Sequence, residues 1–198
     1  SGDATAQSLA DEFGKFAEQQ GWTLAWYSVG AEFAAGRPGT SKLQVAEESI
    51  VSTELVAFRG KKFQDVRTAR NRAGKEGIRA VWTTWNDAGT MIRSQIRALS
   101  EEWVSDKSLP EMGFTLGNLS TLHDPEVRLM LALDEHDNLH GVTSWLPVYE
   151  DGALAGWMLD FMRRDPSGFR PVVEFLIAET LVQAHEDGLG WISLSGAP

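Results

Sequence analysis

The sequence predicts a mixed α/β fold in which helices cover a largely antiparallel sheet. Segments with apolar residues at helical spacing alternate along the chain with short segments of strand-like alternation. In the second half, three consecutive strand-like segments are joined by the turn-like sequences Glu135–Asn138 and Glu150–Gly152. Such joins are typical of an antiparallel meander.

In the first half, helices are expected to be separated by strands and loops. Leu9, Phe13 and Phe16 fall on one face of the first helix, and Gly21 ends it. The expected elements are a helix over 3–20, a strand over Trp22–Val29, a short helix or loop over 30–41, a strand over 42–51 and a helix over 58–76.

The second half gives a clearer pattern. Its expected elements are a strand over Ile78–Trp85, a helix from Asn86 or Asp87 to Ser105, a loop over 106–126, strands over Val127–Leu133, Gly141–Tyr149 and Ala153–Met162, a helix over Phe169–Glu186 and a strand over Trp191–Leu194. This order is typical of a GNAT-type acyltransferase lobe, whose sheet opens beside the third meander strand. Ferredoxin-like and other mixed-sheet domains give similar orders.

Charge is strongly segregated along the chain. The window Arg59–Arg79 carries eight basic and two acidic residues, a net charge of +6. The remainder of the chain carries −16, which gives the total of −10. An acidic chain repels a polyanion, so this basic segment is its candidate contact with nucleic-acid phosphates. The alternative is a solvated helix face. The candidate cations are Lys61, Lys62, Arg67, Arg70, Arg72 and Lys75.

The composition argues against several classes of protein. There is no cysteine, hence no disulfide, thiolate metal site or cysteine nucleophile, and the four histidines are scattered, so no metal is expected. No segment approaches the roughly 20 apolar residues that span a bilayer. The eight tryptophans fall mostly at core-facing positions, which favours a structural role over base stacking.

Three stretches, taken together, resemble the C-terminal domain of phosphatidylglycerol lysyltransferases. They are Phe58–Arg72 followed by Lys75–Gly77, Leu146–Tyr149 with Leu159–Arg164, and Ser193–Pro198. The resemblance runs from about Phe58 to Pro198. It implies transfer of an amino acid from aminoacyl-tRNA to an anionic phospholipid, phosphatidylglycerol, without a cofactor. Lysine is the first candidate, with alanine and arginine left open.

The resemblance also implies a domain organisation. Residues 1–53 would be the trailing part of a first GNAT-like lobe, and residues 54–198 a second GNAT-like lobe that stops short of its C-terminal end. In the family these lobes follow a membrane domain, which implies a location at the cytoplasmic face of the bacterial inner membrane.

The candidate catalytic residues come from the family's Asp-x-x-Arg segment. Carried over to this chain, Asp160 would bind the ammonium group of the amino acid, and Arg163 would hold a phosphate or the terminal ribose. Residues three apart on a strand reach one cleft only if the strand leaves regular geometry. The alternative is a surface ion pair worth at most about 1 kcal/mol.

Four further residues are candidate substrate contacts. Glu174 would face the cleft and read the amino-acid side chain, or else favour the positive end of its helix. Ser193 and Ser195 alternate with Ile192 and Leu194, so both are expected on one face of the last strand, and they lack a nearby His–Asp pair. We therefore expect hydrogen-bonding groups rather than nucleophiles. Tyr149 is either a proton relay or a cross-strand packing residue.

Two competing functions remain open. An acyl-CoA enzyme of the GNAT type would carry a glycine-rich pyrophosphate loop after the third meander strand, but Arg163–Phe169 has a single glycine there. Coenzyme A is therefore disfavoured. The other alternative is a non-catalytic module that binds tRNA or anionic lipid and would show no turnover.

Overall fold

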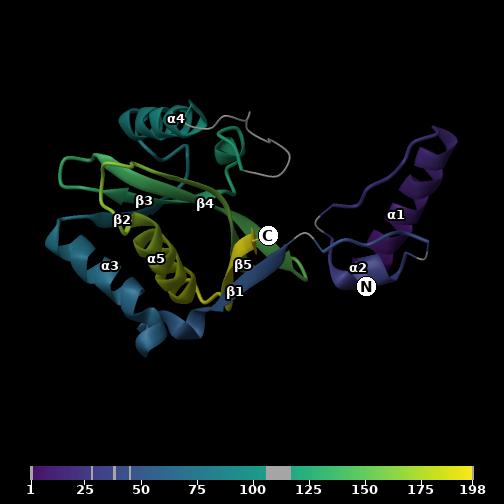
Figure 1. Ribbon diagram of the computed structural model, residues 1–198, viewed down its shortest axis with the longest axis horizontal. Coiled ribbons are helices and arrows are strands. Elements are labelled where there is room, and N and C mark those ends of the chain that lie inside the picture. Colours follow the sequence, from purple (N-terminus) through teal and green to yellow (C-terminus); the bar gives the residue numbers. More distant parts are fainter. Residues whose placement is uncertain (1, 28, 38, 45, 106–116, 198) are drawn as a thin grey trace. The chain divides into compact units, whose positions relative to one another are not determined.

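The computed structural model describes residues 2–197 except 28, 38, 45 and 106–116. The chain divides into two compact units, one ending at Glu47 and the other covering Glu48–Ala197 (Figure 1). The interpretation of the N-terminal part as the end of a first GNAT-like lobe stays a prediction.

The first unit holds two helices, α1 (Gly2–Gln19) and α2 (Ala31–Ala35). Gly21 ends the first helix in the left-handed conformation, with φ of 69°. Arg37 ties the unit together, because its guanidinium donates to Asp11 at 2.8 Å and lies 4.6 Å from the ring centroid of Phe33.

The strand expected over Trp22–Val29 is wrong, because the described part of this segment is irregular. Its aromatic residues pack on helix α1 instead of alternating across a sheet. The ring centroids of Trp22 and Phe16 are 5.6 Å apart, and those of Trp26 and Phe13 are 6.1 Å apart. Tertiary packing onto a helix therefore decides the structure of this segment over its β propensity.

The second unit is built on a six-stranded sheet in the order β1-β6-β5-β4-β3-β2. Strands β2 to β5 pair antiparallel and β5 pairs parallel with β6. The bounds are β1 Glu47–Ser52, β2 Arg79–Thr83, β3 Arg128–Leu133, β4 Leu139–Glu150, β5 Ala153–Arg164 and β6 Trp191–Ala197. The mixed α/β class, the meander and the final strand are thus confirmed.

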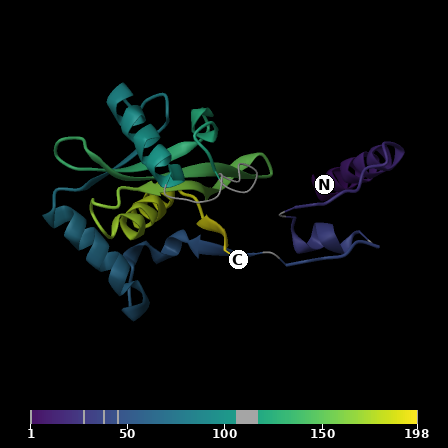
Figure 2. The ribbon, with the colours of Figure 1, turned by 45° about the horizontal axis from the view of Figure 1, so that its top comes forward.

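Helices cover both faces of this sheet (Figures 1 and 2). Helices α3 (Gln64–Lys75) and α5 (Val172–Glu186) pack on one face, where Ala69, Trp145 and Leu176 belong to one core cluster. Helix α4 (Thr90–Ser105) covers the other face, where Ile96 and Phe161 belong to a second cluster. Strand alternation divides the sheet's apolar residues between these two cores.

The basic helix begins later than expected. Phe58 and Gly60 have positive φ values of 45° and 89°, so the backbone leaves helical geometry there. A short 3₁₀ turn over Lys61–Phe63 then leads into α3. Other 3₁₀ turns cover Thr53–Ala57 and Thr121–His123. Among the residues that the structure describes, no helix is both long and apolar enough to cross a bilayer.

Candidate functional site

A β-bulge places Asp160 outside the regular pairing of β5. Leu159 pairs with Trp145 and Phe161 pairs with Ser144, so Asp160 has no partner residue on β4. The bulge also reverses the alternation of the strand. Leu159 packs against the core cluster under α3 and α5, whereas Phe161, two residues on, belongs to the cluster under α4. A bulge of this kind re-aims side chains within a strand.

The carboxyl group of Asp160 is held in an unusual environment. Its Oδ2 atom is buried and accepts no hydrogen bond from any residue that the structure describes. Gly117 packs directly over it, since a Cβ added at Gly117 would lie 2.4 Å from Oδ2. Burial raises the pKa of Asp160 above its usual value. A buried acceptor without a donor is rare in native proteins and marks a candidate ligand contact.

Arg163 lies on the same face of the sheet as Phe161, toward helix α4. Its side chain is 5% exposed, and its guanidinium lies 3.8 Å from the ring centroid of Trp103 and 4.2 Å from that of Phe161. An Nη group donates to the carbonyl of Met162 at 2.9 Å. The cation is therefore fixed by stacking between two aromatic rings. In a regular strand Asp160 and Arg163, three residues apart, would point to opposite faces of the sheet. The bulge at Asp160 removes this constraint.

The regular pairing between β5 and β6 ends just before Asp160, and we call this place the opening. Within the described residues, β5 and β6 pair from Gly156 with Trp191 to Met158 with Ser193, and no further. Ser195 then donates from its hydroxyl to the carbonyl of Leu159, the residue before Asp160. This opening next to the third meander strand agrees with the expectation for a GNAT-like lobe.

The two serines of β6 have structural partners. Ser193 is buried, and its hydroxyl donates to Oε1 of Glu48 on β1 at 2.6 Å. The hydroxyl oxygen of Ser193 in turn accepts the backbone N–H of Ser195, which adopts a left-handed φ of 64°. Ser195 lies at the sheet opening, next to the backbone of Asp160, while Ser193 links β6 to β1.

Tyr149 lies away from this opening. It pairs with Leu154 near the β4–β5 turn, six residues before Asp160, or roughly 20 Å along the strand. Its hydroxyl donates to Oε1 of Glu126 at 3.0 Å, and that hydrogen bond raises the pKa of Tyr149. The structure therefore does not bring Tyr149 together with Asp160.

The candidate cations of the basic helix fall into two groups. Arg67 and Arg70 have partners inside the protein. Arg67 donates to the carbonyls of Phe58 and Gly60, and Nε of Arg70 contacts Oε1 of Glu179 on α5 at 2.6 Å. The side chains that remain exposed are those of Lys61, Lys62, Arg72 and Lys75.

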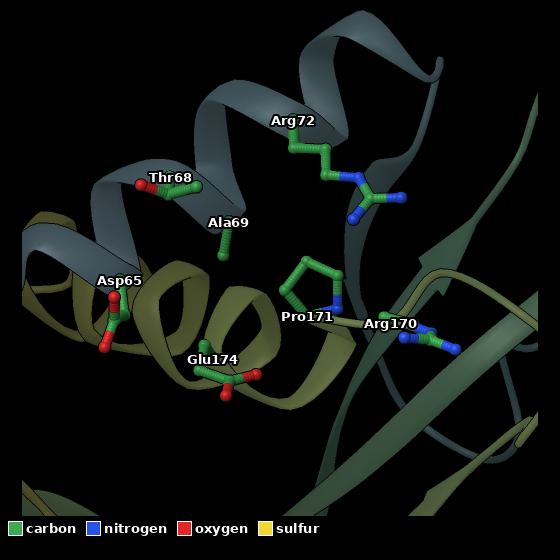
Figure 3. A pocket seen from close by; sticks show the side chains of 7 residues that line it. All are labelled: Asp65, Thr68, Ala69, Arg72, Arg170, Pro171 and Glu174. Atoms are coloured by element: carbon green, nitrogen blue, oxygen red, sulfur yellow. The ribbon is translucent and has the colours of Figure 1, made fainter.

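Glu174 lies on the other face of the sheet from Arg163. It lines a cavity of about 340 Å³ between α3 and α5, together with Asp65, Arg72 and Arg170 (Figure 3). Nε of Arg72 also pairs with Oε1 of Glu76, just beyond the end of α3, at 2.5 Å. The candidate site residues are thus divided between two places, the opening at Asp160 and the cavity at Glu174.

The loop from β5 to α5 uses its own backbone donors internally. The N–H of Ser167 donates to Oδ1 of Asp165 at 2.8 Å, and that of Gly168 to the carbonyl of Asp165 at 3.2 Å. The N–H of Phe169 donates to Nδ1 of His140 at 3.0 Å. Three consecutive amides that could face a pyrophosphate therefore already have acceptors.

Sequence reasoning missed Gly117, Trp103 as the partner of Arg163, and Arg170. Gly117 and Trp103 meet β5 from segments about 40 to 60 residues earlier, and their spacing in the sequence carries no signal of that contact. Arg170 immediately precedes Pro171, the N-cap of α5, and no motif around it marks a site residue. Within the described ranges, no three His, Asp or Glu side chains gather to hold a metal ion.

The fold has a counterpart among solved structures. L-PGS from Bacillus licheniformis superposes on it with a TM-score of 0.83 over 97% of this chain and 58% of that chain, at 22% sequence identity. The chain is therefore a mixed α/β domain of the kind seen in that protein.

Sequence comparison identifies the family. The model of the family described as phosphatidylglycerol lysyltransferase, C-terminal, matches residues 2–198, and the chain belongs to this family. An uncharacterized protein of Corynebacterium glutamicum is 57% identical over 96% of this chain and 24% of its own length. The lysylphosphatidylglycerol biosynthesis bifunctional protein LysX of Nocardia farcinica is 28% identical over 94% and 16%. The chain spans about a quarter or less of these relatives.

Proposed function

We propose that the full-length protein transfers an amino acid, lysine first among the candidates, from aminoacyl-tRNA to phosphatidylglycerol, and that this chain supplies the site for the donor. Family membership and the name of the Nocardia relative support the class of reaction. The observation that carries the proposal is the buried Oδ2 of Asp160, which has no donor among the described residues.

Asp160 is the group that binds the amino acid. A carboxylate without a partner is costly in a partly buried place, and an ammonium group repays that cost by donating to it. Binding of the cation also restores the charged form of the carboxyl group, whose pKa burial alone raises. The donor ester is thereby fixed at the opening between β5 and β6.

The reaction itself needs positioning more than covalent help from the protein. A glycerol hydroxyl of the lipid attacks the ester carbonyl, a new ester bond forms, and the bond to the tRNA ribose breaks. The proton of the lipid hydroxyl ends on the ribose oxygen. Arg163, only 5% exposed, offers too little surface for a phosphate backbone. Its fixed positive charge suits the terminal ribose.

The loop before α5 supports an aminoacyl-tRNA donor over acyl-CoA. An acyl-CoA enzyme of the GNAT type needs backbone amides directed at the pyrophosphate. In this chain the amides of Ser167, Gly168 and Phe169 already donate to Asp165 and His140. The exposed lysines of the basic segment supply charge for tRNA phosphates instead.

The rest of the assembly is inferred from the family. A membrane domain elsewhere in the full-length protein would hold this domain at the cytoplasmic face of the bacterial inner membrane. That position brings the donor, which is soluble, to the anionic lipid acceptor. The N-terminal unit of this chain would then be the end of a preceding GNAT-like lobe.

The test is transfer by the full-length protein. Vesicles containing phosphatidylglycerol are incubated with tRNA charged with radiolabelled lysine, alanine or arginine, and the lipids are separated. We expect label from lysyl-tRNA in phosphatidylglycerol, and none from free lysine with uncharged tRNA. Binding of tRNA without labelled lipid would favour the non-catalytic module. Transfer from an acyl-CoA would favour the ordinary GNAT reaction.

A further inference from the structure

The cavity between α3 and α5 is separate from the opening at Asp160. Its volume of about 340 Å³ is near the lower end of the roughly 300–1,000 Å³ that small-ligand sites occupy. It lies on the face of the sheet covered by α3 and α5, whereas Arg163 and Phe161 face α4. A ligand here would be bound away from the reacting ester.

Charges of opposite sign line different parts of this cavity (Figure 3). The guanidinium groups of Arg72 and Arg170 lie on one side of Pro171, and the carboxylate of Asp65 lies on the other, with Glu174 between. The ring of Pro171 adds a small apolar surface among these charges, beside the buried Ala69. The cavity therefore offers cations, acceptors and a small apolar surface to one ligand.

We propose that this cavity binds an unpaired adenosine or cytidine nucleotide of the RNA donor. The phosphate lies at Arg72 and Arg170, the face of the base rests on Pro171, and the exocyclic amino group donates to Glu174 or Asp65. This inference rests on the proposed function, because an RNA donor is what brings a nucleotide to the surface.

The chemistry favours a nucleotide over simpler ligands. The two carboxylates lie beside the two guanidinium groups and would repel a ligand that carries negative charge alone. A free phosphate or another simple anion therefore fits poorly. A free amino acid would match the charges, but all four charged side chains are exposed, and exposed pairs contribute little to binding one small molecule. The same weak interactions are sufficient to bind one nucleotide of an RNA strand, because the strand makes many other contacts with the protein. Lys75, exposed on α3 beyond Arg72, continues the cationic surface.

The experiment compares bases at constant charge. Fluorescently labelled pentacytidylate, pentaadenylate and pentauridylate are titrated with the 198-residue chain at low salt. Uracil lacks an exocyclic amino group, so we expect it to bind roughly fivefold more weakly than cytosine or adenine. Glu174→Gln can donate as well as accept, and combined with Asp65→Asn it should reduce this difference to less than about twofold. Glu186→Gln, at the far end of α5, is the matched control and should keep the full difference.

The ratio between bases separates recognition from simple repulsion. Removing two carboxylates weakens repulsion of every oligonucleotide equally. If the double variant binds all three more tightly with an unchanged ratio, or if the wild-type chain shows no base preference, the inference is overturned. Arg72→Gln with Arg170→Gln should weaken all three alike, and unchanged binding would also overturn it. Lipid labelling by the full-length protein that carries Glu174→Gln and Asp65→Asn tests the proposed function separately from this inference.

Discussion

The opening at Asp160 and the cavity at Glu174 each lie near both acidic and arginine side chains, and they differ in exposure to water. At the opening, Oδ2 of Asp160 is buried and Arg163 is 5% exposed, so each interaction acts at low dielectric. In the cavity, all four charged side chains are exposed and salt screens them. From this difference we expect one residue to have a large effect at the opening and several residues to share a smaller effect on the other face.

The largest effect is expected from Asp160→Asn, which keeps the shape and removes the charge. Breaking a buried charge pair on one side costs about 3–5 kcal/mol, and about 1.4 kcal/mol is tenfold in rate. We expect lipid aminoacylation by the full-length protein to fall at least a hundredfold, with tRNA affinity retained. Asp151→Asn, in the exposed β4–β5 turn, is the control. Near wild-type transfer by Asp160→Asn would remove this residue from the donor site.

Reversal of three exposed cations should give a smaller effect that depends on salt. Lys61→Glu, Arg72→Glu and Lys75→Glu together should reduce the slope of log affinity for tRNA against log salt by roughly one unit per lost contact. Affinity at low salt should fall roughly thirtyfold, because three exposed contacts of about 0.7 kcal/mol each add to about 2 kcal/mol. Reversal of Lys15 and Lys42 in the N-terminal unit is the control. An unchanged slope would make the helix a solvated surface.

Gly117→Ala tests whether the position of the buried Asp160 carboxylate matters for transfer. The new Cβ would lie 2.4 Å from Oδ2 and 2.7 Å from the carbonyl oxygen of Asp160, so the carboxylate must move. We expect a loss of transfer of roughly tenfold, since a displacement of this size disturbs a positioned reactant. In the Asp160→Asn background the added loss should shrink, because the two changes act on one group.

The control for this variant is Gly89→Ala, where an added Cβ meets nothing within 4 Å. Equal losses from Gly117→Ala in the presence and absence of the Asp160 carboxylate would show that the glycine acts on the fold alone.

The smallest effect concerns stability as a function of pH. Burial raises the pKa of Asp160, so the folded protein holds this proton more tightly than the unfolded chain does. Stability from this group is therefore present below the unfolded pKa of about 3.9 and is lost as pH rises through the folded pKa. Thermal melts of Asp160→Asn against wild type should diverge in favour of the variant over that window, by a few degrees at most. Divergence in the opposite direction would indicate a stabilising partner for the carboxylate.

The meander and helix α5 could be predicted because each lies in one continuous pattern. Residues such as Leu129 and Leu131 alternate with Met130 between the two cores, as strand periodicity requires. The segment Trp22–Val29 could not, since its aromatic residues find partners on a helix rather than across a sheet.

The candidate site was predictable only at single positions. Asp160 could be chosen through the resemblance, but the bulge depends on the register between β4 and β5, which the local sequence does not carry. The approach of Gly117 joins residues 43 positions apart, and the cavity joins α3 to α5 across about 100. Such placements follow from packing of the whole sheet.

The bulge at Asp160 also bears on how this protein can change in evolution. Leu159 pairs with Trp145 and Phe161 pairs with Ser144, which are neighbours on β4, so deletion of Asp160 would leave a regular strand with the other pairs in place. Phe161 and Arg163 would keep their face under α4. The packing of the two cores therefore does not require the extra residue, and its retention depends on the role of its side chain. A relative that has abandoned the chemistry can lose this position by deletion as well as by substitution.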